Sequence, residues 1–343
     1  MANALETPTA LPAHIQLIQM GIASFAAAAL YTAARMSIAD HIGAGVKTAA
    51  ELAGPTGTHA PTLYRFLRSL SNFGVVNEHD GQRFSLTPLG QALRADAPGS
   101  ARSTLLAFCG PTFSRTWEEL PYSLETGKTA FDKAFGMGFF EYLSRHPDDA
   151  SHFSAAMVGY HGPETPAVAE AYDFSGIGTL VDVGGATGNM LAAVLTRHRH
   201  LRGVLFDRPY VVKEAPALLA ARGVADRVSI QAGNFFQGVP PGGDAYLLSH
   251  IIHDWSEEQC VTILGHCRRA IGPRGRVLIV ETVLPADGTP HAGKMQDLVM
   301  LMFPGGMERT EAEYADLLRK ADLRLNRVIP TASIASIVEA VPV

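Results

Sequence analysis

The sequence predicts an α/β fold in which a parallel sheet forms the C-terminal half, preceded by a smaller helical domain. Strand-like and helix-like segments alternate from Thr179 onwards, which is typical of a parallel sheet covered by helices. The first of these strands leads into a glycine-rich turn at 184–188 and then a helix, as at a ligand-binding sheet edge. The preceding part has helix and hairpin patterns instead, and 343 residues suffice for two domains.

The composition predicts a compact protein without affinity for nucleic acid or membranes. Hydrophobic residues make up 47% of the chain, charged residues 18%, and the net charge is −5. Met1–Pro12 lacks the basic start and apolar core of a signal peptide. The apolar stretch Met20–Tyr31 is shorter than the roughly 20 residues of a membrane span. The three cysteines form no paired motif, so we expect a cytoplasmic protein with reduced thiols.

The first element is an alanine-rich helix predicted over Ile15–Ile42. It contains more apolar residues than one buried face accounts for. Burial against a second subunit and burial within its own domain both explain this composition.

A helix–helix–hairpin pattern follows. A short helix is predicted at 47–53 and a longer one at 59–73. A hairpin with an Asp-Gly turn is predicted at 75–86. This order resembles a winged helix-turn-helix. Its second helix carries only Arg65 and Arg68, which are too few for a DNA-reading surface.

Residues 101–172 are helical and rich in aromatic side chains, among them Phe108, Trp117 and Phe153. Residue type alone favours an ordinary core for this cluster, and the alternative is the wall of a pocket for a flat aromatic ligand.

The remaining chain supplies the sheet. Strands are predicted at 180–183, 203–206, 228–231, 245–248 and 277–280, helices near 189–198, 211–222, 256–271 and 310–321, and a closing hairpin within 328–340.

Residues suited to a nucleoside follow the predicted strands in order. Gly184 and Gly185 end the first, Asp207 the second, and Asn234-Phe235 follow the third. Ligands of open α/β sheets bind at these carboxyl ends. An acid is suited to ribose hydroxyls, and an amide beside an aromatic ring to adenine. The turn has Ala186 and Asn189 where a dinucleotide fingerprint needs glycines, which argues against a dinucleotide.

His253 is the predicted general base. It follows the fourth strand end, and an imidazole accepts a proton near neutral pH. Deprotonating a phenol makes it a nucleophile for a methyl group. Glu281 and Glu308 are both candidates for the carboxylate that orients the imidazole.

A metal site is the alternative for the histidines. His250 and His253 are three residues apart, and His198 and His200 form a second pair. Neither spacing is compelling, and we predict no metal.

With these motifs, the chain resembles the small-molecule O-methyltransferases that include the plant caffeate, animal hydroxyindole and bacterial antibiotic-pathway enzymes. The motifs that carry the resemblance are Asp182–Gly188, Phe206–Pro209, Gly233–Phe236, His253–Trp255 and Gly305–Thr310. The resemblance implies a Rossmann-like class I methyltransferase domain at 173–343, a winged-helix dimerisation domain at 1–100 and a helical linker at 101–172.

The resemblance also implies residue roles. Catalysis would use His253 with Glu281 and Glu308. S-adenosylmethionine would be the cofactor and S-adenosylhomocysteine the product. The predicted cofactor contacts are Gly184, Gly185, Asp207, Arg208, Asn234, Phe235 and Ser249. The predicted acceptor contacts are Phe108, Trp117, Phe153, Met157, His250, Asp254, Asp297 and Met300.

Three positions depart from the family pattern: Ala186 replaces a glycine, Asn234 an aspartate and Ser249 the lysine of plant members.

The sequence thus predicts a homodimeric enzyme that methylates a phenolic hydroxyl of an aromatic secondary metabolite. One alternative keeps the fold and cofactor for hydroxylation, decarboxylation or pericyclic chemistry, which needs no base such as His253. The other is a ligand-sensing winged-helix regulator.

Overall fold

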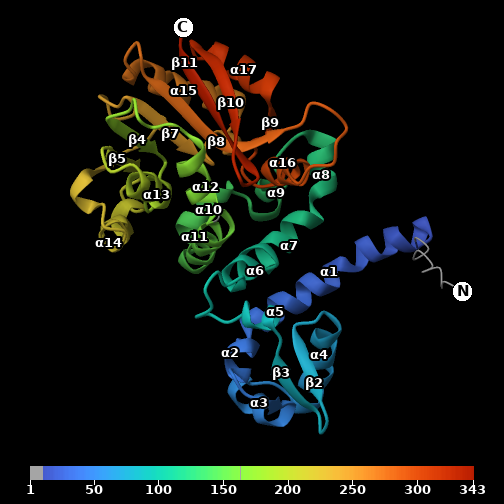
Figure 1. The fold of residues 1–343 in the computed structure, drawn as a ribbon. Helices are drawn as coiled ribbons and strands as arrows, with labels where there is room; N and C mark the ends of the chain where they lie inside the picture. Colours follow the sequence, from blue (N-terminus) through green and yellow to red (C-terminus); the bar gives the residue numbers. More distant parts are fainter. Residues whose placement is uncertain (1–10, 163) are drawn as a thin grey trace, which may run out of the picture. The chain divides into compact units, whose positions relative to one another are not determined.

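The computed structural model describes residues 11–162 and 164–343, which form two compact units (Figure 1). The first unit runs up to Arg115 and includes Pro147–Gly159. The second comprises Thr116–His146 and Tyr160–Val343.

The first unit contains the predicted helix–helix–hairpin arrangement. Helices α3 and α4 precede strands β2 and β3, and β1 completes a small antiparallel sheet in the order β1-β3-β2. A capping box between Thr48 and Glu51 starts α3. The core of this unit is built around Leu67, Leu70 and Phe84. The elements that begin in this unit are α1 (Ala13–Arg35), α2 (Ile38–Ile42), β1 (Lys47–Thr48), α3 (Ala49–Thr56), α4 (Ala60–Asn72), β2 (Val76–His79), β3 (Arg83–Leu86), α5 (Pro88–Gln91), α6 (Arg102–Phe108), α7 (Pro111–Glu118) and α11 (Pro147–His161).

The predicted single helix over Ile15–Ile42 is wrong, because the chain breaks between α1 and α2. Ser37 adopts a left-handed backbone conformation with φ of 51°, which no α-helix can continue through.

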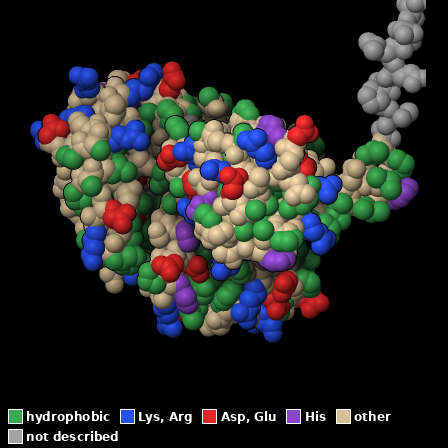
Figure 2. All heavy atoms as spheres, turned by 90° about the horizontal axis from the view of Figure 1, so that it is seen from below, with side chains coloured by type: hydrophobic (Ala, Val, Ile, Leu, Met, Phe, Trp, Pro, Cys, Tyr) green, Lys and Arg blue, Asp and Glu red, His purple; other side chains and the backbone are tan. Residues whose placement is uncertain are grey.

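The expectation that the apolar N-terminal stretch is too short for a membrane is also wrong. Helix α1 has 23 residues and a mean hydropathy of 1.5, and it is long and apolar enough to span a bilayer. Only 11% of its most apolar 18-residue segment is buried. Leu17, Met20 and Phe25 are each more than two-thirds exposed. Figure 2 shows hydrophobic side chains gathered at the end of α1 beside the grey residues.

The second unit is built on one mixed sheet with the order β10-β11-β8-β7-β4-β5-β6. The strands from β8 to β6 are parallel. Strand β11 pairs antiparallel with β8, and β10 pairs antiparallel with β11. The strands are β4 (Thr179–Val183), β5 (Arg202–Asp207), β6 (Val228–Ala232), β7 (Ala245–Ser249), β8 (Arg276–Leu284), β9 (Arg309–Thr310, beside the end of β8), β10 (Leu323–Pro330) and β11 (Ala335–Pro342).

Helices cover both faces of this sheet. Alternate residues of each strand point to opposite faces, and each face packs into its own hydrophobic cluster. Leu180 packs into one cluster and Val181 into the other. The predicted helices are confirmed, whereas α16 and β9 were not predicted. The helices of this unit are α8 (Leu120–Thr126), α9 (Ala130–Phe135), α10 (Phe139–Arg145), α12 (Glu164–Ala171), α13 (Asn189–Arg197), α14 (Ala215–Ala221), α15 (Glu257–Ala270), α16 (Gly293–Met302) and α17 (Glu311–Lys320).

Candidate active site

The glycine-rich turn after β4 is held by the carboxylate at the end of β5. Gly184, Ala186 and Gly188 all have positive φ, and Ala186 is the non-glycine residue among them, at 50°. The Ala186 N–H donates to Asp207 Oδ2 over 2.8 Å, and the Arg208 N–H donates to Asp207 Oδ1 over 2.6 Å. Two of the four acceptor positions of Asp207 are therefore used within the protein.

The turn has no room for side chains at Gly184 and Gly185. A Cβ atom at Gly184 would lie 2.4 Å from Ile251 Cδ1, and one at Gly185 would lie 2.4 Å from Asp182 Oδ2. Burial raises the pKa of Asp182 to about 7, and the charge of Asp207 adds to this rise, while the Leu191 backbone offsets part of it. The Asp182 carboxylate therefore occupies the space that a side chain at position 185 would need.

The other predicted cofactor residues lie at the same edge, since β7, β4, β5 and β6 are neighbours in the sheet. The ring of Phe235 is 5.9 Å from that of Trp255, and Asn234 Oδ1 accepts the Phe236 N–H over 3.1 Å. Ser249 is the half-buried last residue of β7, and Arg208 is exposed. The fold thus gathers all seven predicted cofactor residues at one edge.

His253 lies in a short 3₁₀ helix (Ile252–Asp254) after β7 and is only 5% exposed. Its Nδ1 is 2.7 Å from Glu308 Oε1. Glu281 does not contact the imidazole: its Oε1 accepts the backbone N–H groups of His253 and Ile251, over 3.0 and 3.1 Å. Tyr314 donates to the other oxygen of Glu281. Glu308 therefore orients the ring, and Glu281 fixes the turn that carries it.

The surrounding acids control the protonation of His253. Burial alone lowers its pKa, but the charges of Asp254, Glu308 and Glu281 outweigh burial and raise the pKa to about 10. Asp254 Oδ1 lies 3.6 Å from Nε2. Burial in turn raises the pKa of Asp254 to about 7 and also raises that of Glu308. The arrangement can fix Nδ1 and hold a proton at Nε2.

The loop before β9 brings Glu308 to His253. The Met307 N–H donates to the His253 carbonyl over 2.9 Å. A Cβ atom at Gly306 would lie 1.9 Å from that carbonyl oxygen, so only glycine fits. Asp297 Oδ1 accepts the Glu308 N–H over 2.8 Å, so this predicted acceptor residue supports the loop.

The predicted acceptor residues are divided between the units. Phe108, Phe153 and Met157 belong to the first unit. Half-buried Trp117 and Met300 belong to the second. His250, Asp254 and Asp297 are also in the second unit. The sequence did not single out Phe140, whose ring stacks on Trp255 with centroids 5.4 Å apart.

His250 has partners that sequence spacing did not indicate. Its Nε2 is 2.6 Å from Glu164 Oε2, and His161 Nδ1 is 3.0 Å from Glu164 Oε1. Burial lowers the pKa of His250 to about 4. Because 86 positions separate Glu164 from His250, no local motif reveals the cluster.

Comparison with known proteins shows the family to which the chain is similar over nearly its whole length. The O-methyltransferase domain model matches residues 117–324, and the O-methyltransferase dimerisation domain model matches residues 18–96. Phenazine O-methyltransferase PhzM of Lysobacter antibioticus is 41% identical over 334 residues, which cover 97% of this chain and 98% of that protein. O-demethylpuromycin-O-methyltransferase of Streptomyces alboniger is 40% identical over 318 residues, or 91% of this chain and 84% of that protein.

Solved structures agree in fold. The mitomycin 7-O-methyltransferase MmcR superposes with a TM-score of 0.91 at 36% identity, covering 96% of this chain and 98% of that one. The methyltransferase CalO1 was solved with S-adenosylhomocysteine bound. The chain therefore belongs to the O-methyltransferase family, with a class I methyltransferase fold and S-adenosylmethionine as its methyl donor.

Proposed function

We propose that this enzyme methylates a phenolic hydroxyl of an aromatic secondary metabolite, with His253 as general base. The observation that carries the proposal is the buried His253, whose Nδ1 is held by Glu308 beside the glycine-rich turn. An orienting carboxylate on one ring nitrogen leaves the other for proton transfer.

His253 Nε2 accepts the hydroxyl proton as the acceptor oxygen attacks the methyl carbon in line. Bound S-adenosylmethionine supplies an electrophilic methyl group on a sulfonium, whose sulfur keeps the bonding electron pair when the methyl group leaves. Glu308 stabilises the imidazolium, and Glu281 keeps the turn in place. A phenol has a pKa of about 10 and is a weak nucleophile until it loses this proton.

The turn at the end of β4 fits the cofactor. Side chains are excluded at Gly184 and Gly185, so the backbone can approach a ligand closely. We assign the remaining acceptor positions of Asp207 to the ribose hydroxyls, and Asn234 with Phe235 to adenine. Arg208 and Ser249 complete the proposed cofactor contacts.

Aromatic acceptors are supported by a relative. The O-methyltransferase NcsB1 of neocarzinostatin biosynthesis was solved with S-adenosylmethionine and 2-hydroxy-5-methyl naphthoic acid. We assign the acceptor of this chain to the same chemical class. The proposed contacts within the second unit are Trp117, His250, Asp254 and Met300, with Asp297 acting indirectly.

We also propose a cytoplasmic homodimer formed through residues 1–100, with the catalytic domain at 173–343 and without a nucleic-acid or membrane partner. Helix α1 has the exposed apolar surface that such a dimer would bury. Acidic and basic side chains are interspersed on the face seen in Figure 2, which offers no continuous basic surface for nucleic acid.

The test is methyl transfer from labelled S-adenosylmethionine to a panel of hydroxylated aromatics and N-heteroaromatics. We expect His253→Ala to lower kcat on phenols by about 10²–10⁴-fold, the usual contribution of a general base. His79→Ala is the matched control, because this exposed histidine pairs with Ser85 in the hairpin of the first unit. Full activity of His253→Ala on phenols would refute the role of His253.

Two relatives are named as N-methyltransferases, including phenazine-1-carboxylate N-methyltransferase of Pseudomonas aeruginosa at 33% identity. A neutral heteroaromatic nitrogen has a lone pair and needs no base. Turnover confined to N-heteroaromatics, and unchanged in His253→Ala, would assign the enzyme to N-methylation instead.

A further inference from the structure

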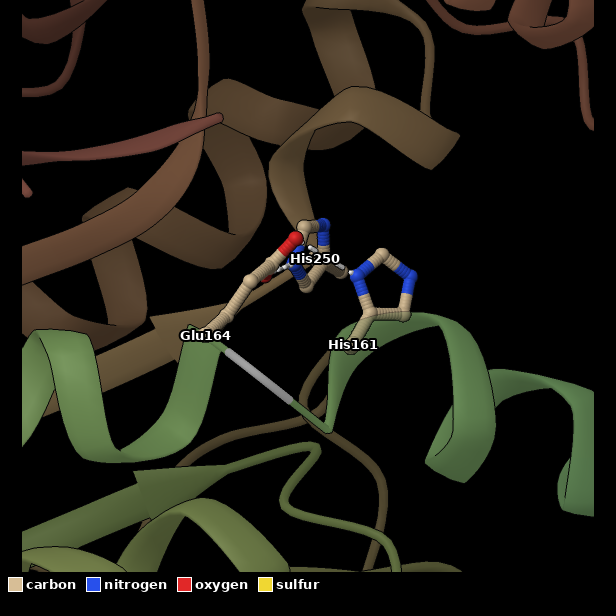
Figure 3. A group of neighbouring side chains, drawn as sticks. All are labelled: His161, Glu164 and His250. Atoms are coloured by element: carbon tan, nitrogen blue, oxygen red, sulfur yellow. Dashed lines mark hydrogen bonds and ion pairs between the residues drawn. The ribbon is translucent and has the colours of Figure 1, made fainter. Parts of the chain in front are cut away.

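A second cluster of histidines and acid lies within the second unit. His161 ends α11, Glu164 begins α12, and His250 directly follows β7. Figure 3 shows the three side chains converging, and the carboxylate of Glu164 is within hydrogen-bond distance of both imidazoles. One potential ligand atom from each residue lies within 4.8 Å of the other two.

The carboxylate in this cluster is deeply buried. Glu164 is 3% exposed, and its oxygens contact His161 Nδ1 and His250 Nε2 over 3.0 and 2.6 Å. Among the residues that the structure describes, no lysine or arginine forms an ion pair with Glu164. A buried charge without a cationic partner is costly. The cluster therefore suits a ligand that brings positive charge.

We propose that His161, Glu164 and His250 form a binding site for one divalent transition-metal ion, of which zinc is the best match. Two imidazoles and one carboxylate are a ligand set that zinc and related ions use, with at least one coordination position left open. Ligands at 2.0–2.1 Å from a tetrahedral ion lie about 3.3–3.4 Å apart. The two hydrogen-bonded pairs, at 3.0 and 2.6 Å, are both shorter than this separation, so the side chains must move apart by less than about 1 Å to admit the ion.

The proton count of the site also balances. Without metal, each imidazole donates the hydrogen of the nitrogen that faces Glu164. When a metal takes that nitrogen, the hydrogen resides on the other ring nitrogen, so each histidine stays neutral. His250 Nδ1 is buried and has no hydrogen-bond partner among the described residues, so no existing bond has to be broken at this atom.

The site is adjacent to the proposed base but separate from it. The ring centroids of His250 and His253 are 5.2 Å apart, while His253 is held by Glu308. Metal binding can therefore be measured directly and does not depend on methyl transfer, so failure of one proposal leaves the other standing.

The experiment uses the full-length protein, stripped with a chelator and titrated with Co²⁺ as a spectroscopic probe and with Zn²⁺ in competition. We expect one Co²⁺ per chain, with the visible absorption bands of a four- or five-coordinate ion, displaced by Zn²⁺. Glu164→Ala and His250→Ala should each weaken Co²⁺ binding by at least about 100-fold. Loss of a residue that only hydrogen-bonds to a metal ligand costs about 10–100-fold, so this threshold distinguishes a ligand from a supporting residue.

His198→Ala together with His200→Ala is the matched control, because these histidines hydrogen-bond to the carbonyls of Ala169 and Phe174 and should not affect Co²⁺ binding. Anomalous scattering from Zn²⁺-soaked wild-type crystals locates the bound ion directly, without depending on whether a variant folds. The absence of stoichiometric Co²⁺ binding, or a zinc peak away from Glu164, would overturn the proposal and leave a hydrogen-bonded cluster.

Discussion

At the scale of single residues, Ala186 is held in a conformation that its side chain disfavours. Its φ is 50°, and its N–H donates to Asp207. A left-handed conformation costs an L-residue about 1–2 kcal/mol. The replacement of glycine by Ala186 therefore matters chiefly for the backbone conformation.

Ala186→Gly should therefore stabilise the protein. The relief of about 1–2 kcal/mol is partly offset by about 0.4–1 kcal/mol of added entropy in the unfolded chain, so a modest net gain in the free energy of unfolding is expected. Chemical denaturation measures it. Ala217→Gly, in the exposed part of α14, is the control and should destabilise. A loss of stability in Ala186→Gly would show that the turn is unstrained.

The protonation of His253 gives a prediction about pH. Its raised pKa means that the free protein holds the proton through neutral pH, and the stability derived from that charge is lost only as pH rises towards 10. As a base it must be neutral, so kcat should rise with pH. The positive sulfonium of the bound cofactor should lower the pKa and move this rise towards neutrality.

Asp254→Asn and Glu308→Gln each remove a negative charge near His253, so both should shift the rising part of the kcat profile to lower pH. Glu308→Gln should also lower the maximal rate, because it weakens the orientation of the ring. Measuring kcat against pH for the three proteins checks this. A profile that stays in place in both variants would mean that another group limits the rate.

At the scale of elements, the loop that carries Glu308 is fixed by backbone contacts with the His253 turn. Gly306 lies directly against the His253 carbonyl, and Met307 donates to it. The base and its orienting acid are therefore aligned by main-chain packing, before any ligand binds.

Gly306→Ala should separate these two elements. We expect kcat to fall by at least about tenfold, since small misplacement of catalytic groups is costly, while the Kd for S-adenosylmethionine changes little. Calorimetry and steady-state kinetics distinguish the two effects. Gly272→Ala is the control, because a Cβ atom there meets nothing within 4 Å. Equal loss in both parameters would contradict a local role.

The sequence predicted the elements that periodicity and turn chemistry encode. The five parallel strands, the closing hairpin and the short helix predicted at 47–53 are confirmed. The break at Ser37 was missed because nothing in an alanine-rich helical pattern signals a left-handed serine. Helix α16 was missed because its periodicity is weak and its position depends on packing.

Within the site, order along the chain predicted which strand ends meet, because parallel strands end at one edge. It did not distinguish Glu281 from Glu308, since both follow strand or loop segments that converge on His253. The expectation of no metal considered His250 only with its sequence neighbours. The partners of His250 are instead His161 and Glu164, which only the tertiary fold brings close.

At the scale of the whole molecule, helix α1 exposes several large apolar side chains, which commonly marks an interaction surface. Leu17 and Phe25 are 69% and 68% exposed. The match to a dimerisation domain over residues 18–96 indicates a second copy as the covering partner.

The double variant Leu17→Glu with Phe25→Glu should therefore give monomers, because charges cannot be buried unpaired in an apolar interface. Light scattering after size-exclusion chromatography measures the mass. Leu124→Glu is the control, since this leucine is 70% exposed in the second unit and should leave the mass unchanged. If the double variant keeps the wild-type mass but loses binding to lipid vesicles, α1 is a membrane contact instead.

The two units are interleaved along the chain, because Pro147–Gly159 returns to the first unit after the chain has entered the second. The first unit is thus incomplete until the ribosome has added residue 159, and the second needs residues from both sides of that insertion. Domains normally complete folding as units during synthesis. Here a single proteolytic cut or truncation cannot release either unit whole, so the units must mature together.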